Sequence, residues 1–274
     1  MSDRFESLEF EEAEQLTLET AIANLKSTDL GLRFYAAWWM GKFRIDDPEA
    51  ISLLIAALQD SDDRTEDGGY PLRRNAARAL GKMNAVNAVS ALVACLDCSD
   101  YYVREGAAQS LAMLGDRSCT PALVALLDGG VDAAQMVPGK PHLVQPYDAV
   151  LEALGALNAS DELEKIQEFL DHPVARVRFA SARALYQITE DGQFGDRLID
   201  GLQESELQLR RAALMDLGAT NYLLAAPAIA ETLAENSLKL IAIKGLLDNH
   251  FANDEPVTIS DEVGGILKLM DTLL

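Results

Sequence analysis

Apolar residues recur at helical spacing in segments that repeat along the chain. In residues 72–81, Leu72, Ala76 and Leu80 lie four residues apart and Ala79 falls beside them, which places all of them on one face of a helix. Copies of this pattern begin at Leu32, Val103, Val177 and Leu209, and weaker copies begin at Pro146 and Leu238. A recurrence of roughly 30 to 45 residues is typical of repeat arrays. We therefore expect a stack of similar units.

A second apolar segment at helical spacing follows each copy. It covers residues 86–96 after the copy at Leu72, and its counterparts cover residues 48–60, 120–130, 162–171, 194–204 and 226–235. Pro48 and Pro121 stand where the first turn of a helix needs no amide hydrogen, and Gly81 is expected to end its helix in the left-handed conformation. Neither helix can bury its apolar face alone, so neighbouring units must complete the core.

The pattern predicts an all-α fold, a right-handed α-solenoid of HEAT-like two-helix repeats. About seven repeats would form one solenoid over residues 17–274, preceded by an acidic N-terminal arm, residues 1–16. Most copies carry an arginine at their second position: Arg33, Arg73, Arg104, Arg178 and Arg210. A positive charge at a helix start opposes the macrodipole, so we interpret these residues as a structural ladder that bonds carboxylates or carbonyls of the preceding unit. Tyr147 and Lys239 replace the arginine in the two weaker copies.

Two insertions interrupt the array, near residues 61–71 and 128–147. Inserted loops of solenoids lie on one face, which is often the binding face. Pro138, Pro141 and Pro146 would hold the second loop extended. Tyr70 and Tyr147 close the two loops, and we expect their side chains to project into a shared space.

The charge balance excludes several kinds of partner. The chain has 23 Lys and Arg against 44 Asp and Glu, a net charge of −21, so it is not expected to bind nucleic acid or an anionic membrane surface. No segment approaches the roughly 20 apolar residues that span a bilayer. The acidic start is unlike a secretory signal, and an odd count of 3 cysteines points to a reducing compartment, so we expect a cytoplasmic protein.

Motifs for metal or nucleophilic chemistry are incomplete. Cys95 and Cys98 have the spacing of a redox or zinc pair, but no second pair or nearby histidine completes a site, so we interpret them as packing thiols. His142, His172 and His250 are far apart, and we predict no metal site. Aromatic residues crowd two repeat starts. Trp38 or Trp39 is expected in the core, whereas Tyr101 and Tyr102 fit either a structural role or ligand contact.

Several segments together carry a family resemblance over about residues 15 to 250. They are FYAAWWMGKFR (34–44), DDRTEDGGYPLRRNAARALGKM (62–83), CSDYYVREGAAQSLAMLGD (98–116), KPHLVQPYDAVLEALG (140–155), QLRRAALMDLG (208–218) and AETLAENSLKLIAIKGLL (230–247). The chain resembles the E-type, or alpha, chains of the heterodimeric E/F bilin lyases. The loop segments are more specific than the repeat motif, because generic helical repeats would not share them.

The resemblance implies that phycocyanobilin, a linear tetrapyrrole, is attached to a cysteine of the phycocyanin alpha subunit through a thioether bond. A related F-type solenoid, the beta subunit, would complete a heterodimer. The acceptor thiolate would add to the ethylidene group of the bilin A ring, and an adjacent ring carbon would take a proton. Because the acceptor protein supplies the nucleophile, this chain would orient the bilin and manage the proton. Phycocyanobilin would be a substrate, with no tightly bound cofactor.

Residue types that match a bilin cluster at the interrupted repeats. Arginine suits the propionates, carboxylates suit the pyrrole N–H groups, and aromatic rings suit the conjugated face. The candidate catalytic residues are Tyr101, Arg104, Glu105 and His142. The candidate bilin-binding residues are Tyr70, Arg73, Arg74, Tyr102, Tyr147 and Asp148, and Asp62, Asp63 and Glu66 are further candidates.

Both chain ends carry apolar residues suited to a partner. Residues 266–274 are mostly apolar, whereas the cap of a solenoid usually presents a polar outer face, and the N-terminal arm carries Phe5, Leu8 and Phe10. We predict that the C-terminal region and the arm contact the partner chain; alternatively these residues close the array internally. Two other functions stay open: a lyase-isomerase subunit for phycoerythrocyanin, and a non-enzymatic adaptor that binds phycobiliproteins.

Overall fold

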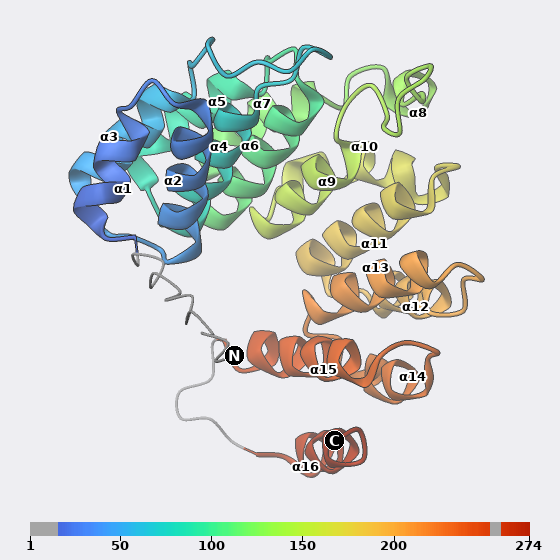
Figure 1. Cartoon of the computed structure of the whole chain (residues 1–274). Helices are drawn as coiled ribbons and strands as arrows, with labels where there is room; N and C mark the ends of the chain where they lie inside the picture. Colours follow the sequence, from blue (N-terminus) through green and yellow to red (C-terminus); the bar gives the residue numbers. More distant parts are fainter. Residues whose placement is uncertain (1–15, 253–258) are drawn as a thin grey trace, which may run out of the picture.

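A computed structural model describes residues 16–252 and 259–274, which form a curved stack of helices in two layers (Figure 1). The first helices of successive repeats pack against one another as an inner layer. The inner layer consists of α2 (Leu30–Lys42), α4 (Pro71–Lys82), α6 (Tyr101–Leu114), α9 (Tyr147–Ala156), α11 (Ala175–Thr189), α13 (Leu207–Gly218) and α15 (Asn236–His250). The predicted all-α solenoid is confirmed.

The second helices form an outer layer, and each is shorter than the inner helix of its own repeat. They are α3 (Pro48–Ala57), α5 (Val89–Cys95), α7 (Thr120–Ala125), α10 (Leu163–Gln167), α12 (Gly192–Gly201) and α14 (Ala226–Glu231). Short 3₁₀ turns lead into or out of several of them: η1 (Val86–Ala88), η2 (Arg117–Cys119), η3 (Ser160–Glu162), η4 (Glu168–Asp171) and η5 (Leu223–Ala225). The remaining helices are α1 (Leu18–Leu25), α8 (Gly130–Ala133) and α16 (Asp261–Asp271).

The predicted apolar face of each inner helix is buried between the two layers. In α4, Leu72, Ala76, Ala79 and Leu80 are all buried, and Pro71 occupies the first turn. Asn75 is also buried, and its side-chain amide donates to the Phe34 carbonyl at 3.2 Å, which ties α4 to α2. Alanine and leucine dominate this core because small side chains let helix backbones approach closely.

The expectation for Gly81 was wrong. Gly81 lies within α4, and the left-handed residue after this helix is Asn84, with φ of 54°. Gly81 instead provides room for the next helix, because a Cβ added to it would lie 2.5 Å from Ser110 Oγ and 2.7 Å from Ser110 Cα on α6. The same repeat position is Gly41 on α2, where an added Cβ would lie 2.7 Å from Ala79 Cα. This glycine position therefore sets helix-to-helix distance.

The arginine ladder follows the predicted pattern in four repeats. Arg73 donates to the Asp60 carbonyl, Arg104 to the Cys98 carbonyl at 2.6 Å, Arg178 to the His172 carbonyl at 3.0 Å, and Arg210 to the Glu204 carbonyl at 2.7 Å. Arg33 differs, because it pairs with the Asp60 side chain at 2.5 Å at the end of its own unit. Lys239 donates to the Ala230 carbonyl at 2.9 Å, so the lysine fills the same role.

The C-terminal helix α16 covers the last repeat incompletely. Val263 and Ile266 are buried, whereas Leu267 is 41% exposed and Leu274 is 94% exposed. Part of the apolar surface at this end therefore closes the array, and part faces outward. The arm residues Phe5, Leu8 and Phe10 lie outside the described residues. Over residues 16–252 and 259–274, no helix combines the length and apolar character that crossing a membrane requires.

Candidate functional site

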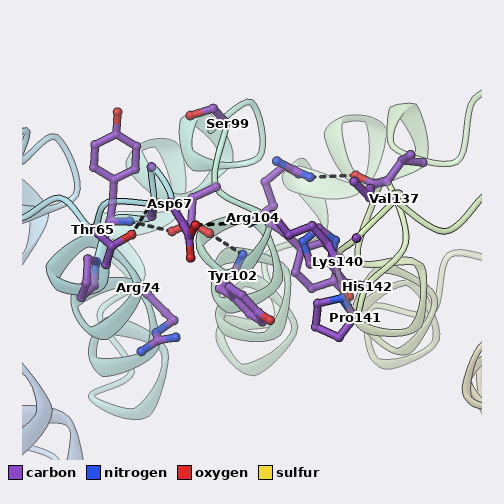
Figure 2. Close-up of a pocket in the computed structure, with 18 residues that line it drawn as sticks. Thr65, Asp67, Arg74, Ser99, Tyr102, Arg104, Val137, Lys140, Pro141 and His142 are labelled. Carbon is purple, nitrogen blue, oxygen red and sulfur yellow. Dashed lines mark hydrogen bonds and ion pairs between the residues drawn. The ribbon is translucent and has the colours of Figure 1, made fainter.

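The two insertion loops meet above the start of α6 and enclose a pocket of about 680 Å³, here called the loop pocket. Figure 2 shows Thr65 and Arg74 on one side of it, Lys140, Pro141 and His142 on the other, and Tyr102 and Arg104 between them. Both loops lie along the same edge of the stack (Figure 1), as insertions on a common face require. The two insertions therefore lie on a common face, and its role in binding stays a prediction.

Asp100 fixes the first loop to α6. It caps α6 by accepting from the Tyr102 amide at 2.9 Å, and its second oxygen accepts from the Tyr70 amide at 2.7 Å. The loop itself closes at Thr65, whose hydroxyl accepts from the Gly69 amide at 2.8 Å. Sequence reasoning did not select Asp100, although an aspartate directly before an inner helix is a recognisable cap signal.

Arg104 fixes the second loop to the same helix. Its Nη1 donates to the Cys98 carbonyl at 2.6 Å, and its Nη2 donates to the Val144 carbonyl at 2.8 Å. A bridge between Met136 and Leu143 narrows the loop to a hairpin-like turn. Because both terminal nitrogens of Arg104 are engaged by backbone, this candidate catalytic residue holds the wall of the pocket in place.

An aromatic cluster forms one wall of the loop pocket. The rings of Tyr101 and His142 stack, with centroids 4.2 Å apart and planes inclined by 17°. Tyr102 meets both edge-on, with centroids 5.3 Å from Tyr101 and 5.8 Å from His142. Nδ1 of His142 lies 2.8 Å from the Leu143 carbonyl and donates to it, which leaves Nε2 available to a ligand. Burial raises the pKa of Tyr101, and Asp148 and Glu105 raise it further, so its phenol stays protonated.

Arg74 supplies a positive charge without a carboxylate partner. Within residues 16–252 and 259–274 its guanidinium forms no ion pair, and its buried Nε has no hydrogen-bond partner. The guanidinium carbon lies 5.8 Å from the Tyr102 ring centre. Lys140 on the opposite loop is 3.8 Å from Asp67, and Arg73 stacks over Tyr70 at 4.1 Å. The loop pocket therefore combines aromatic faces with a cation suited to a carboxylate.

Seven candidate residues lie outside the lining of the loop pocket, among them the further candidates Asp62, Asp63 and Glu66 of the first insertion. Tyr147 is 1% exposed and stacks on Phe169 in the core, so its ring does not share a space with Tyr70 as expected. Glu105 pairs with Arg78 at 2.7 Å and Asp148 pairs with Arg176 at 3.4 Å on the inner layer. Arg73 belongs to the arginine ladder. The pocket does bring together Tyr70, Arg74, Tyr101, Tyr102, Arg104 and His142.

A shared arginine on the inner layer escaped sequence reasoning. Nη1 of Arg183 on α11 lies 3.3 Å from Glu152 on α9 and 3.3 Å from Asp216 on α13. Burial raises the pKa of Glu152 to about 7 and that of Asp216 to about 6. The Asp216 carboxylate raises the pKa of Glu152 further, whereas Arg183 lowers the pKa of both groups. The guanidinium groups of Arg183 and Arg176 oppose this rise only in part, so both carboxyl groups hold a proton more readily than a free carboxylate does. Three separate repeats contribute these residues, so no local motif announced them.

The cysteines agree with the interpretation as packing thiols. Cys95 and Cys119 are buried, and burial raises the pKa of Cys95 to about 11, which leaves it a poor nucleophile. Among the residues that the structure describes, no group of three or more His, Cys, Asp or Glu side chains could hold a metal ion.

Comparison with known proteins places these features in a family. Residues 32–60 match the family of PBS lyase HEAT-like repeats, and residues 65–135 match that of HEAT repeats. Phycocyanobilin lyase subunit alpha from Nostoc sp. strain PCC 7120 is 58% identical over 265 residues, covering 96% of this chain and 96% of that protein. The chain belongs to the phycocyanobilin lyase alpha-subunit family. The resemblance found in the loop segments is thus confirmed.

A solved structure and a more distant relative extend this comparison. A solved structure, the complex of CpcE and CpcF of phycocyanin lyase from the same Nostoc strain, contains a chain 57% identical with a TM-score of 0.89, covering 99% of this chain and 100% of that one. Bilin biosynthesis protein PecE from Mastigocladus laminosus is 40% identical over 240 residues, covering 87% of this chain and 84% of that protein. Subunit-alpha relatives are therefore closer to this chain than PecE is.

Proposed function

We propose that this chain is one subunit of a lyase that joins phycocyanobilin to a cysteine of the phycocyanin alpha subunit. Its partner would be an F-type solenoid, as in the related complex of CpcE and CpcF. The bilin would be the substrate, with no tightly bound cofactor. The free cysteines suit the reducing conditions of the cytoplasm, where we place the reaction.

The bilin would bind in the loop pocket. The observation that supports this is the convergence of both insertions on one aromatic wall beside the unpaired Arg74. A propionate would pair with the Arg74 guanidinium, whose Nε lacks a partner within the described chain. A pyrrole ring would lie along the edge of the Tyr101–His142 stack, with Tyr102 turned across it.

The chemistry needs orientation and one proton. The acceptor thiolate forms a carbon–sulfur bond at the ethylidene carbon of ring A, and the electron pair of that double bond takes a proton at the adjacent ring carbon. No oxidant or reductant enters. We assign the proton transfer to His142 Nε2. Its Nδ1 is already fixed as a donor to the Leu143 carbonyl, so Nε2 would first take the proton of the acceptor thiol and then deliver it to the ring carbon. Tyr101, held protonated by burial, would donate a hydrogen bond to the bilin and keep the imidazole in place.

Reconstitution tests the proposal. The purified chain, its F-type partner, phycocyanobilin and apo-phycocyanin alpha subunit should yield a thioether adduct with an unchanged chromophore. His142→Ala should lower the transfer rate at saturating bilin, and Arg74→Gln should weaken bilin binding. His250→Ala, which changes a histidine outside the loop pocket, is the matched control.

Other outcomes would point to the rival functions. An isomerised chromophore in the product would favour a lyase-isomerase, and binding without ligation would favour an adaptor. Equal transfer by wild type, His142→Ala and Arg74→Gln would exclude the loop pocket as the site.

A further inference from the structure

The unpaired cations of this acidic chain are concentrated in one region. Most of its 23 Lys and Arg side chains pair with a carboxylate or donate to a backbone carbonyl. Within residues 16–252 and 259–274, the ones that do neither are Lys42, Arg44, Arg64, Arg74, Lys82 and Lys268. All but Lys268 fall between residues 42 and 82, on α2, on α4 or in the segments that join them. Residues 42–82 also hold 8 Asp and Glu against 7 Lys and Arg, so the segment has no net positive charge. These five cations are instead distinguished by having no carboxylate or carbonyl partner, which leaves each able to pair with an anion.

An exposed aromatic stripe lies in the same region. Tyr35, Trp38 and Lys42 stand at i, i+3 and i+7 on α2 and so share one face. The Tyr35 and Trp38 rings stack with centroids 5.4 Å apart, and Lys42 Nζ lies 4.7 Å from the Trp38 ring centre. Tyr35 is 47% exposed and Trp38 is 40% exposed. A ring stack left open to solvent beside an ammonium group suits a flat, conjugated anion.

The stripe continues onto α4. Arg74, Arg78 and Lys82 stand at i, i+4 and i+8, so they line one face over about 12 Å of helix. Gly41 and Ala79 hold α4 against α2, and Lys82 has the same position in its repeat, counted from Leu72, as Lys42 has counted from Leu32. A small hollow of about 230 Å³ between α4 and α6 is lined by Arg78 and Lys82 together with Gln109, Ser110 and Met113.

The α4 stripe connects the two places. Arg74 lines the loop pocket, and Lys82 lies two turns further along the same helix face, beyond Arg78. Arg78 already pairs with Glu105, so Lys82 and Lys42 are the cations left for a second carboxylate. A ligand that begins at Arg74 therefore reaches this surface without leaving the helix.

We propose that Tyr35, Trp38, Lys42 and Lys82, here called the α2–α4 surface, form a second contact site for a planar conjugated dicarboxylate whose first carboxylate binds at Arg74. This inference rests on the proposed function, in which the ligand is phycocyanobilin. One propionate pairs with Arg74 and the other with Lys42 or Lys82, and Trp38 packs on the conjugated face. The surface would orient the long axis of the bilin along the inner layer.

Titration of the complex of this chain and its F-type partner, followed by bilin absorbance, tests this surface. Two probes are used: free phycocyanobilin, and its dimethyl ester, in which both propionates are uncharged. Lys42→Glu combined with Lys82→Glu should weaken binding of the free acid about tenfold and leave the ester nearly unaffected. Lys165→Glu combined with Lys244→Glu, the same total charge change at two lysines outside the α2–α4 surface, should leave both affinities as in wild type. Trp38→Leu should weaken binding of both probes.

The result that overturns the inference is wild-type affinity for free phycocyanobilin in the doubly substituted chain. The same holds if that variant loses the acceptor protein but keeps the bilin, since the surface would then dock an acidic protein. Failure of the proposed function looks different: Arg74→Gln would leave bilin binding and transfer intact whatever the α2–α4 surface does. Because Lys42 and Lys82 are exposed, these variants should fold, and circular dichroism checks that they do.

Discussion

Replacing Gly81 by alanine should push two inner helices apart and destabilise the stack. The added Cβ would lie 2.5 Å from Ser110 Oγ, 2.6 Å from Ser110 Cβ and 2.7 Å from Ser110 Cα, all shorter than van der Waals contact. Ser110 has little freedom to move, because it is buried and its hydroxyl donates to the Ala77 carbonyl at 2.7 Å. The clash therefore falls on the backbones of α4 and α6.

The expected size follows from two opposing effects. Overpacking of a close helix contact costs about 1–3 kcal/mol. Removing a glycine from a helix interior returns about 0.5–1 kcal/mol. We expect Gly81→Ala to lower the free energy of unfolding by about 1–2 kcal/mol, measured by urea denaturation followed by circular dichroism. Gly264→Ala is the matched control, because nothing lies within 4 Å of its added Cβ. Only the gain from replacing a glycine inside a helix should appear, as slower hydrogen exchange in α16.

A second-site change makes the reasoning refutable. Ser110→Gly removes two of the three atoms that the new methyl group meets, Oγ and Cβ, so Gly81→Ala with Ser110→Gly should lose less stability than the two single changes added together. Strict additivity of the two losses would show that the contact does not limit the spacing of α4 and α6. Full stability of Gly81→Ala alone would refute the argument directly.

Three further changes test separate parts of the structure. Tyr147→Ala should lower the free energy of unfolding by about 3–5 kcal/mol, because the ring is buried against Phe169. Tyr147→Phe should keep both the stability and the rate of bilin transfer. Slow transfer by a stable Tyr147→Phe would show that the tyrosine hydroxyl takes part in the site. Because the pKa of Glu152 is raised in the folded state, its protonated form stabilises the fold at low pH, and this contribution is lost as pH rises through about 7. The free energy of unfolding, measured by urea denaturation at each pH, should therefore fall by about 1–3 kcal/mol between pH 5 and 8. The fall should be smaller in Glu152→Gln. Arg104→Lys cannot span both carbonyls, so hydrogen exchange at residues 137–144 should accelerate while global unfolding stays near wild type; unchanged exchange would contradict the role given to Arg104.

The repeat architecture was predictable because its signals are local. The spacing of Leu72, Ala76 and Leu80 lies within one helix, and ladder arginines such as Arg104 and Arg210 bond carbonyls of the loop just before their own helix. The role of Gly81 was not predictable in the same way. A glycine near a helix end reads as a terminator, and only the neighbouring helix reveals that it makes room for Ser110.

The candidate site was predictable in its location and less so in its members. The insertions pointed to the loop pocket, and the aromatic residues at the start of α6 pointed to its wall. The prediction for Tyr147 was wrong because the first residue after a loop can point into the core, and residue type alone does not show whether it does. The pairing of Glu152 and Asp216 with one arginine could not be predicted from the sequence, because the three residues belong to three different repeats. Such pairings depend on the stacking of repeats, which no single segment encodes.

The glycine contacts also divide the inner layer mechanically. Backbones touch through glycine between α2 and α4, between α4 and α6, between α9 and α11, and between α13 and α15. At the junctions of α6 with α9 and of α11 with α13, the same repeat position holds Ala112 and Tyr186, so no glycine contact forms there. The layer therefore consists of three groups of glycine-linked helices joined at two seams without such a contact. The second insertion crosses the first seam, and Arg104 spans it by holding Val144, so any bending of the solenoid there changes the width of the loop pocket.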